Sequence, residues 1–106
     1  MILEAAYLIV KKGTERAFEE DFSKAAQYIS SISGYIKHEL HQCLEQENKY
    51  LLLVEWERLE DHTIGFRQSA VYQKWKALLH HYYEPFPVVE HFTKIYAQQK
   101  SGGMNY

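Results

Sequence analysis

Residues 50–56 read Tyr-Leu-Leu-Leu-Val-Glu-Trp and carry the strongest structural signal in this 106-residue chain. A strand with one face in water alternates apolar and polar residues, whereas the five residues from Tyr50 to Val54 are all apolar. Both sides of the sheet must therefore be covered near this strand. Because alternate side chains of a strand share a face, Trp56 lies on the side of Tyr50, and we expect that side to meet helices.

The sequence on either side of this strand predicts a β-α-β-β-α-β order. Apolar residues at intervals of three and four indicate helices, and Gly or Pro marks their ends. Thr14 and Ser69 are the expected helix N-caps. The predicted elements are a strand over 2–11, a helix over 14–31, strands over 35–45 and 50–56, a short helix near 59–66, a helix over 69–82 and a strand over 88–96.

This order is typical of the α+β, ferredoxin-like fold, an antiparallel sheet with both helices on one face. The other face of such a sheet would expose an apolar patch larger than monomers usually carry. A second copy of the sheet is the simplest cover, so we expect a homodimer formed through the sheet face. Residues 1–97 are predicted to form a single domain, and residues 98–106 a flexible C-terminal tail.

The composition excludes several classes of partner. Lys and Arg number 12 against 14 Asp and Glu, so neither nucleic acid nor an anionic membrane surface is an expected partner. The apolar runs are too short to span a membrane. Cys43 is the one cysteine and is expected to be a small strand residue, and Met1 is not followed by a secretory signal, which predicts a cytoplasmic protein.

No cofactor or metal site is predicted. The sequence contains no glycine-rich phosphate loop and no Rossmann fingerprint. His38 and His41 lie on opposite faces of a strand, and the adjacent His80 and His81 point about 100° apart on a helix, so neither pair is suited to hold one ion. The sequence leaves open which way His91 points, because the register of its strand is not determined.

Two short sequence segments resemble motifs of the antibiotic biosynthesis monooxygenase family of dimeric α+β barrels. In that family a hairpin strand ends in an aromatic residue followed by an acidic or small polar one, and a Ser-x-x-Tyr or Ser-x-x-Phe step leads into the second helix. Trp56-Glu57 and Ser69-Ala-Val-Tyr72 are similar to these steps. The resemblance covers residues 2–97. It implies the fold and dimer above, but the family includes several reactions, so particular residues must indicate the chemistry.

The haem-degrading members of the family resemble one another in an Asn, an aromatic residue and a His. The corresponding positions here are Ala6, Phe66 and Lys76. A lysine is a poor replacement for a histidine iron ligand, because its ammonium group must first lose a proton. His80 could supply an iron ligand, but it lies about 6 Å beyond Lys76 along the helix, too far to replace it without moving the haem. Haem breakdown is therefore the alternative function and not the first prediction.

The phenol-oxygenating members have an Asn, a Trp and a Tyr at positions that correspond to Leu52, Trp56 and His62. The resemblance therefore implies a cofactor-independent monooxygenase that acts on a small aromatic molecule, a phenol or a quinol. Because the Asn is absent, and because Phe66 stands where many members have His, a non-catalytic ligand-binding dimer of the same fold is a further alternative.

The predicted catalytic residues are His62 and Tyr72. His62 is the candidate base because the pKa of histidine is nearest neutrality, and Tyr72 is a possible hydrogen-bond donor. Each has a simpler interpretation, His62 as a surface histidine and Tyr72 as a packing residue. Trp56 could stack on a planar substrate or be an ordinary core residue. The predicted substrate-binding residues are Trp56, Leu52, Phe66 and Trp75.

Overall fold

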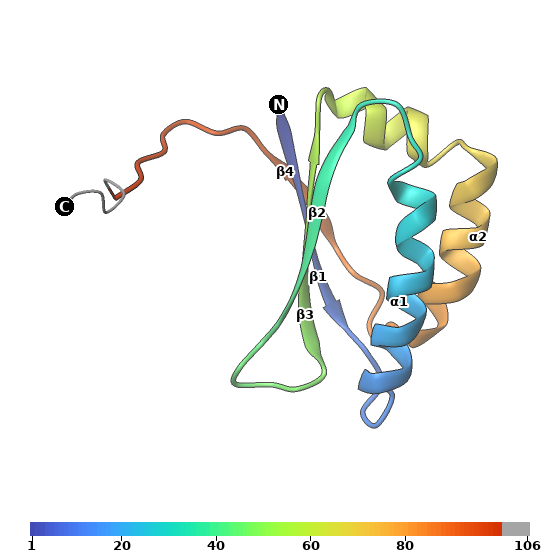
Figure 1. Cartoon of the computed structure of the whole chain (residues 1–106). Helices are drawn as coiled ribbons and strands as arrows, with labels where there is room; N and C mark the ends of the chain where they lie inside the picture. The colour runs from blue at the N-terminus through green and yellow to red at the C-terminus, as the bar shows by residue number, and fades with distance from the viewer. Residues whose placement is uncertain (101–106) are drawn as a thin grey trace.

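The structure, a computed structural model, describes residues 1–100; residues 101–106 of the predicted tail lie outside the described part. The antiparallel sheet has the strand order β2-β3-β1-β4, and α1 and α2 cover one face of it (Figure 1). The predicted α+β, ferredoxin-like fold is thus confirmed. Its elements are β1 (Ile2–Ile9), α1 (Glu15–Ile29), β2 (Tyr35–Gln42), β3 (Lys49–Trp56), a π-helical segment (Asp61–Phe66), α2 (Ala70–Leu79), a 3₁₀ turn (His80–Tyr82) and β4 (Val89–Phe92).

Strand β3 has its larger side chains on the helix side, as its sequence predicts. Tyr50, Leu52, Val54 and Trp56 are all buried, whereas the residues between them are partly exposed. On this side they pack against the apolar stripe of α1, and the core also includes residues of β1 and α2. The prediction that the face with Trp56 meets the helices is confirmed.

The two predicted N-caps differ in the structure. The Ser69 side chain accepts a hydrogen bond from the backbone N–H of Tyr72, 3.2 Å away, which caps α2 as predicted. Thr14 occupies the N-cap position of α1, but its side chain makes no capping hydrogen bond. Its hydroxyl instead donates to the Lys11 carbonyl oxygen, so Thr14 is the N-cap by position, as predicted, without a capping side chain.

The last strand is shorter than predicted. Only Val89–Phe92 pairs with β1, and residues 93–100 continue without secondary structure, away from the body of the molecule (Figure 1). Extended backbone becomes a strand only where a neighbouring strand can accept its hydrogen bonds, and beyond Phe92 there is no such neighbour among residues 1–100. Strand β2 is also shorter than the predicted 35–45, so Cys43 lies just beyond its end, in the loop that follows Gln42.

Candidate functional site

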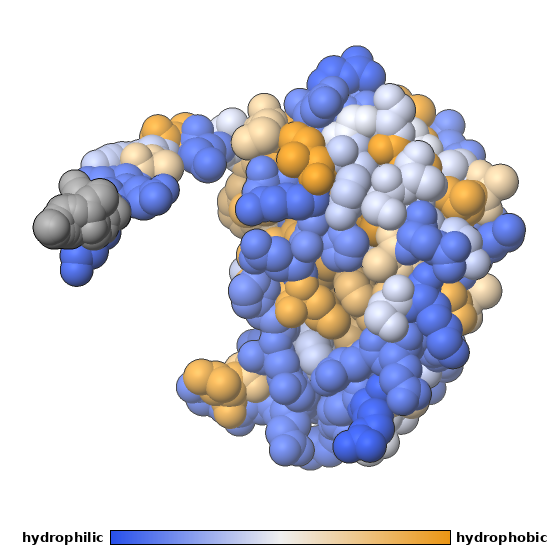
Figure 2. All heavy atoms as spheres, in the orientation of Figure 1, coloured by the Kyte–Doolittle hydropathy of each residue, from blue (hydrophilic) through white to orange (hydrophobic). Residues whose placement is uncertain are grey.

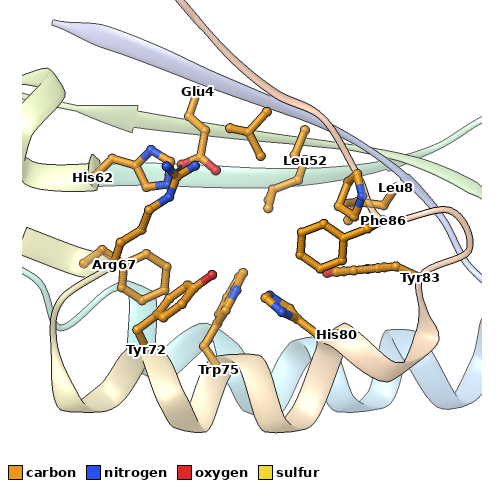
Figure 3. Close-up of a pocket in the computed structure, with 14 residues that line it drawn as sticks. Glu4, Leu8, Leu52, His62, Arg67, Tyr72, Trp75, His80, Tyr83 and Phe86 are labelled. Carbon is orange, nitrogen blue, oxygen red and sulfur yellow. Dashed lines mark ion pairs between the residues drawn. The ribbon is translucent and has the colours of Figure 1, made fainter. Parts of the chain in front are cut away.

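A cavity of about 330 Å³ lies between the sheet and α2. Figure 3 shows its walls, with the side chains of α2 on one side and those of the sheet on the other. Five of the six predicted site residues line it: Leu52, His62, Phe66, Tyr72 and Trp75. A volume near the lower end of the range for small-molecule sites suits a ligand of one or two aromatic rings.

Local structure explains how these five residues meet. His62 and Phe66 are both buried in the π-helical segment, one turn apart, and therefore face the same way. Tyr72 and Trp75 have the same kind of spacing on α2, whose start is set by the Ser69 cap. Leu52 enters from the helix side of β3.

Trp56 does not line the cavity. Its side chain is completely buried behind the wall, and its indole ring stacks on His62 with ring centroids 5.6 Å apart and an interplanar angle of 19°. The indole N–H donates a hydrogen bond to Oε1 of Glu4 over 3.0 Å. Trp56 therefore holds two wall residues in place, which differs from the predicted stacking on a substrate.

Glu4 is the cavity residue with the most unusual surroundings, and sequence reasoning missed it. It lies on β1 and is 5% exposed, on the helix side with Ala6 and Leu8. Burial raises its pKa from 4.5 to about 7, although the Trp56 hydrogen bond and the positive charge of Arg67 act in the opposite direction. The carboxyl group is therefore ready to take up or release a proton near neutral pH.

The signal that could have revealed Glu4 is its place in the sequence. It follows Ile2-Leu3 and precedes Ala5-Ala6 in a strand, and strand alternation puts it on the same face as the apolar Ala6. A charged residue at a position expected to face the core is rare unless it is paired or functional. The composition of the stretch by itself predicts only a β-forming run.

His62 connects Glu4 to the edge of the sheet. Its Nε2 lies 3.4 Å from Glu4 Oε1, and its Nδ1 makes a 2.8 Å hydrogen bond with Nε2 of His91. Burial, with smaller contributions from the charges of Arg67 and His91, lowers the pKa of His62 to about 3. The imidazole is therefore neutral at pH 7, and it is a weaker base than the neighbouring carboxylate.

The register of β4 answers the question that the sequence left open for His91. His91 pairs with Glu4 of β1, so both side chains point to the helix side of the sheet. His38 and His41 lie on opposite faces of β2, as expected, because His38 pairs with Val54 and His41 with Leu51.

Three further lining residues come from outside the predicted set, Arg67 at one end of the cavity and His80 and Phe86 at the other (Figure 3). Arg67 follows the π-helical segment, and His80 and Phe86 come from the end of α2 and the loop before β4. Burial lowers the pKa of His80. Lys76, which stands at the family position of the iron ligand, is exposed and does not line the cavity.

Within residues 1–100, no three His, Cys, Asp or Glu side chains are grouped closely enough to hold a metal ion. In the same part of the chain, no helix is both long and apolar enough to cross a membrane.

Comparison with known proteins supports the resemblance seen in the sequence. The sequence model of the family described as "Antibiotic biosynthesis monooxygenase" matches residues 1–78. The uncharacterised protein YczJ of Bacillus subtilis (strain 168) is 59% identical over 95 residues, which make up 90% of this chain and 100% of YczJ.

Solved structures show the same architecture. A candidate antibiotic biosynthesis monooxygenase of Bordetella bronchiseptica superposes with a TM-score of 0.86 at 33% identity, over 90% of this chain and 97% of that one. A variant of SnoaB, a cofactor-independent oxygenase of Streptomyces nogalater, has a TM-score of 0.71 at 18% identity, over 93% and 97% of the two chains, and shares the fold. This chain belongs to the antibiotic biosynthesis monooxygenase family.

Proposed function

We propose that this protein is a monooxygenase that oxidises an electron-rich aromatic molecule, a phenol or a quinol, without a metal or an organic cofactor. The observation that carries the proposal is Glu4, a buried carboxyl group with a pKa of about 7 on the wall of an aromatic-lined cavity. A base of that pKa is well matched to removing a proton from a weak acid at neutral pH.

The substrate itself supplies the electrons for this reaction. Glu4 accepts the phenolic proton, and the resulting anion reacts with O₂ to form a carbon–oxygen bond and a peroxide. The peroxide takes the proton from Glu4. The ring carbon then loses its hydrogen as a proton, the O–O bond breaks, a carbonyl forms, and the distal oxygen leaves as water. A water-poor cavity favours these steps because it does not solvate the anion.

The predicted site residues take different roles in this scheme. We assign the base to Glu4 rather than to His62, because the lowered pKa of His62 makes it a poor proton acceptor. His62 and Trp56 act as positioning residues for the Glu4 carboxyl group. Tyr72 donates a hydrogen bond to a ligand oxygen in this scheme. The side chains of Leu52, Phe66 and Trp75 form the apolar walls that contact the aromatic ring of the substrate.

We also propose that the protein acts as a homodimer joined through the bare face of the sheet. That face carries Tyr7, Leu51, Leu53 and Phe92, and Tyr7 and Phe92 are 48% and 46% exposed. Two projecting segments flank it on the side away from the helices, the β2–β3 hairpin and residues 93–100 (Figure 1). Figure 2 shows apolar atoms on both, and Leu44 and Ile95 are among the most exposed apolar residues.

The experiment that tests the function is oxygen uptake with a panel of phenols and quinols. We expect the wild-type protein to oxidise at least one of them and to form the quinone, and Glu4→Gln to lose about 100-fold or more of that rate. Glu57→Gln, which changes an exposed glutamate outside the cavity, is the matched control. Binding of panel members without oxygen uptake would favour the non-catalytic ligand-binding dimer.

The haem-degrading alternative rests on His80, which lines the cavity from the 3₁₀ turn after α2. The site does not fit haem well. Lys76 is exposed and does not line the cavity, and a cavity of about 330 Å³ suits one or two rings better than a porphyrin.

A further inference from the structure

We propose that the ligand of this cavity carries an anionic oxygen, either a carboxylate or an ionised phenol oxygen, and that Arg67 binds it. The inference deepens the proposed function, because it names the chemical class of ligand for the same cavity. It rests on the position of Arg67, on the absence of an ion pair with it among residues 1–100, and on the charges of the other cavity residues.

Arg67 reaches the cavity from the residue that follows the π-helical segment. Its side chain lines the cavity and points in the direction of Glu4 and His62 (Figure 3). Its positive charge lowers the pKa of Glu4 and of His62, so the guanidinium group acts electrostatically on the place where the reacting proton would be. A ligand held against Glu4 would therefore also be within the influence of Arg67.

No ion pair in residues 1–100 involves Arg67. The nearby Arg58 shows the contrast, because its guanidinium lies 3.3 Å from the Asp61 carboxylate and it does not line the cavity. A guanidinium group presents a planar set of N–H donors that matches a carboxylate or a similar oxyanion. At Arg67 these donors are available to a ligand.

The remaining cavity groups do not supply a competing positive charge. His62 and His80 both have lowered pKa values and are neutral at pH 7, and burial raises the pKa of the Tyr83 hydroxyl, which is neutral as well. Glu4 can be protonated at little cost, since its pKa is about 7. An anionic ligand can thus enter beside Glu4, which takes up a proton, and pair with Arg67 among apolar walls where the attraction is strong.

The first arm of the test measures binding without turnover, by isothermal titration calorimetry under anaerobic conditions. We expect 2-naphthoate to bind at least ~10-fold more tightly than 2-naphthamide, which has the same shape and no charge. In Arg67→Gln the two ligands should bind within about 2-fold of each other, whereas Arg67→Lys should keep part of the preference. Lys74→Gln, which changes an exposed lysine of α2, is the control for general charge and should keep all of it.

The second arm distinguishes an ionised phenol from a carboxylate. Bound 4-nitrophenol should ionise at a lower pH than free 4-nitrophenol, as seen in its absorbance, and Arg67→Gln should remove that shift. A preference for naphthoate alone identifies a carboxylate, and a nitrophenol shift alone identifies a phenolate. Equal binding of the two naphthalene ligands together with an unshifted nitrophenol would overturn the inference, as would the same preferences in a folded Arg67→Gln variant.

Failure of this inference differs from failure of the proposed function. A protein that binds naphthoate through Arg67 but takes up no oxygen with any phenol would refute the monooxygenase and keep the anion site. A protein that oxidises phenols with a rate unaffected by Arg67→Gln, and that has no preference for naphthoate, would refute the anion site and keep the monooxygenase.

Discussion

Two opposing effects act on the Glu4 carboxyl group. Burial disfavours the charged form, whereas the Trp56 N–H and the Arg67 guanidinium favour it. The result is a pKa of about 7, between that of an exposed glutamate and that of a carboxyl group buried with no polar partner. Each variant at this site should therefore have an effect that depends on pH.

The pH dependence of the oxidation rate should follow the ionisation of Glu4. The carboxylate is the form that accepts a proton, so the rate at low substrate concentration should rise through about pH 7 and level off above it. Trp56→Phe removes the N–H donor that favours the carboxylate, and we expect it to move this rise to higher pH. A rise that stays at the same pH in Trp56→Phe would contradict the role given to the indole.

The same carboxyl group should reduce the free energy of unfolding at high pH. The pKa of Glu4 in the folded protein is above its unfolded value of 4.5, so there is no cost below about pH 4.5 and the full cost above about pH 7. We expect Glu4→Gln to be more stable than wild type by up to about 3 kcal/mol at pH 8, and the gain to vanish near pH 4.

Chemical denaturation at the two pH values measures this difference. Both proteins retain His62, whose lowered pKa costs stability as the pH falls below about 6.5, so the comparison between them removes most of that contribution. Glu57→Gln should show the same small change at both pH values. A Glu4→Gln gain that is equal at pH 4 and pH 8 would show that the carboxyl group is not buried in its charged form.

His80 allows a direct test of the haem alternative. Because the cavity is small and Lys76 is exposed, we expect haemin to give no saturable Soret shift of the kind that histidine ligation produces, and no ring opening on addition of a reductant. A stoichiometric shift that His80→Ala abolishes would place the protein among the haem-degrading members of the family.

The π-helical segment is held in place by one close approach to the loop before β2. Gly34 has φ +89°, and a Cβ atom added there would lie 2.0 Å from Oδ2 of Asp61. Asp61 is the residue before His62, and its carboxylate also accepts a hydrogen bond from the Arg58 backbone N–H over 3.0 Å. The position of His62 in the cavity therefore depends on a glycine far from it in the sequence.

Gly34→Ala should therefore be more destabilising than Gly13→Ala. Both glycines have positive φ, so both substitutions cost roughly 1 kcal/mol of backbone strain, but a Cβ at Gly13 meets nothing within 4 Å. The clash with Asp61 should add about 2 kcal/mol or more to the loss in Gly34→Ala. Thermal unfolding of the two variants measures the difference, and equal losses would mean that Asp61 moves aside freely.

For the molecule as a whole, the main open surface is the face of the sheet opposite the helices. A 12.6 kDa chain of this size buries a modest core, so an apolar face of this kind is a substantial part of what it could bury. Apolar residues of β1, β3 and β4 lie together there, and charged residues of β2 border them.

A charge placed in the middle of that face should dissociate the dimer. We expect light scattering to give twice 12.6 kDa for the wild type at micromolar concentration, and a monomer for Leu53→Asp, because a buried unpaired carboxylate costs several kcal/mol. Ile64→Asp, at an exposed position of the π-helical segment, should remain dimeric. A monomeric wild type would remove the argument that a partner covers the sheet.

Periodicity in the sequence was enough to predict the fold. The unbroken apolar run in β3, the stripe of α1 and the Ser69 cap are local patterns, and each leads to its element because burial and backbone hydrogen bonding act on neighbouring residues. The cavity wall at Leu52, Phe66 and Trp75 follows from the same patterns, since a residue on the inner face of an element must meet the opposite layer.

The chemistry of the site depends on contacts between residues far apart in the chain. Glu4 acquires its raised pKa only because folding buries it, although its hydrogen bond from Trp56 acts in the opposite direction, and His91 reaches His62 only through the register of β4. Desolvation and charge are properties of surroundings built by several strands and helices, which no local pattern contains. For that reason the sequence predicted where the cavity would be, whereas the folded chain placed the carboxyl group, and not the histidine, as the candidate base.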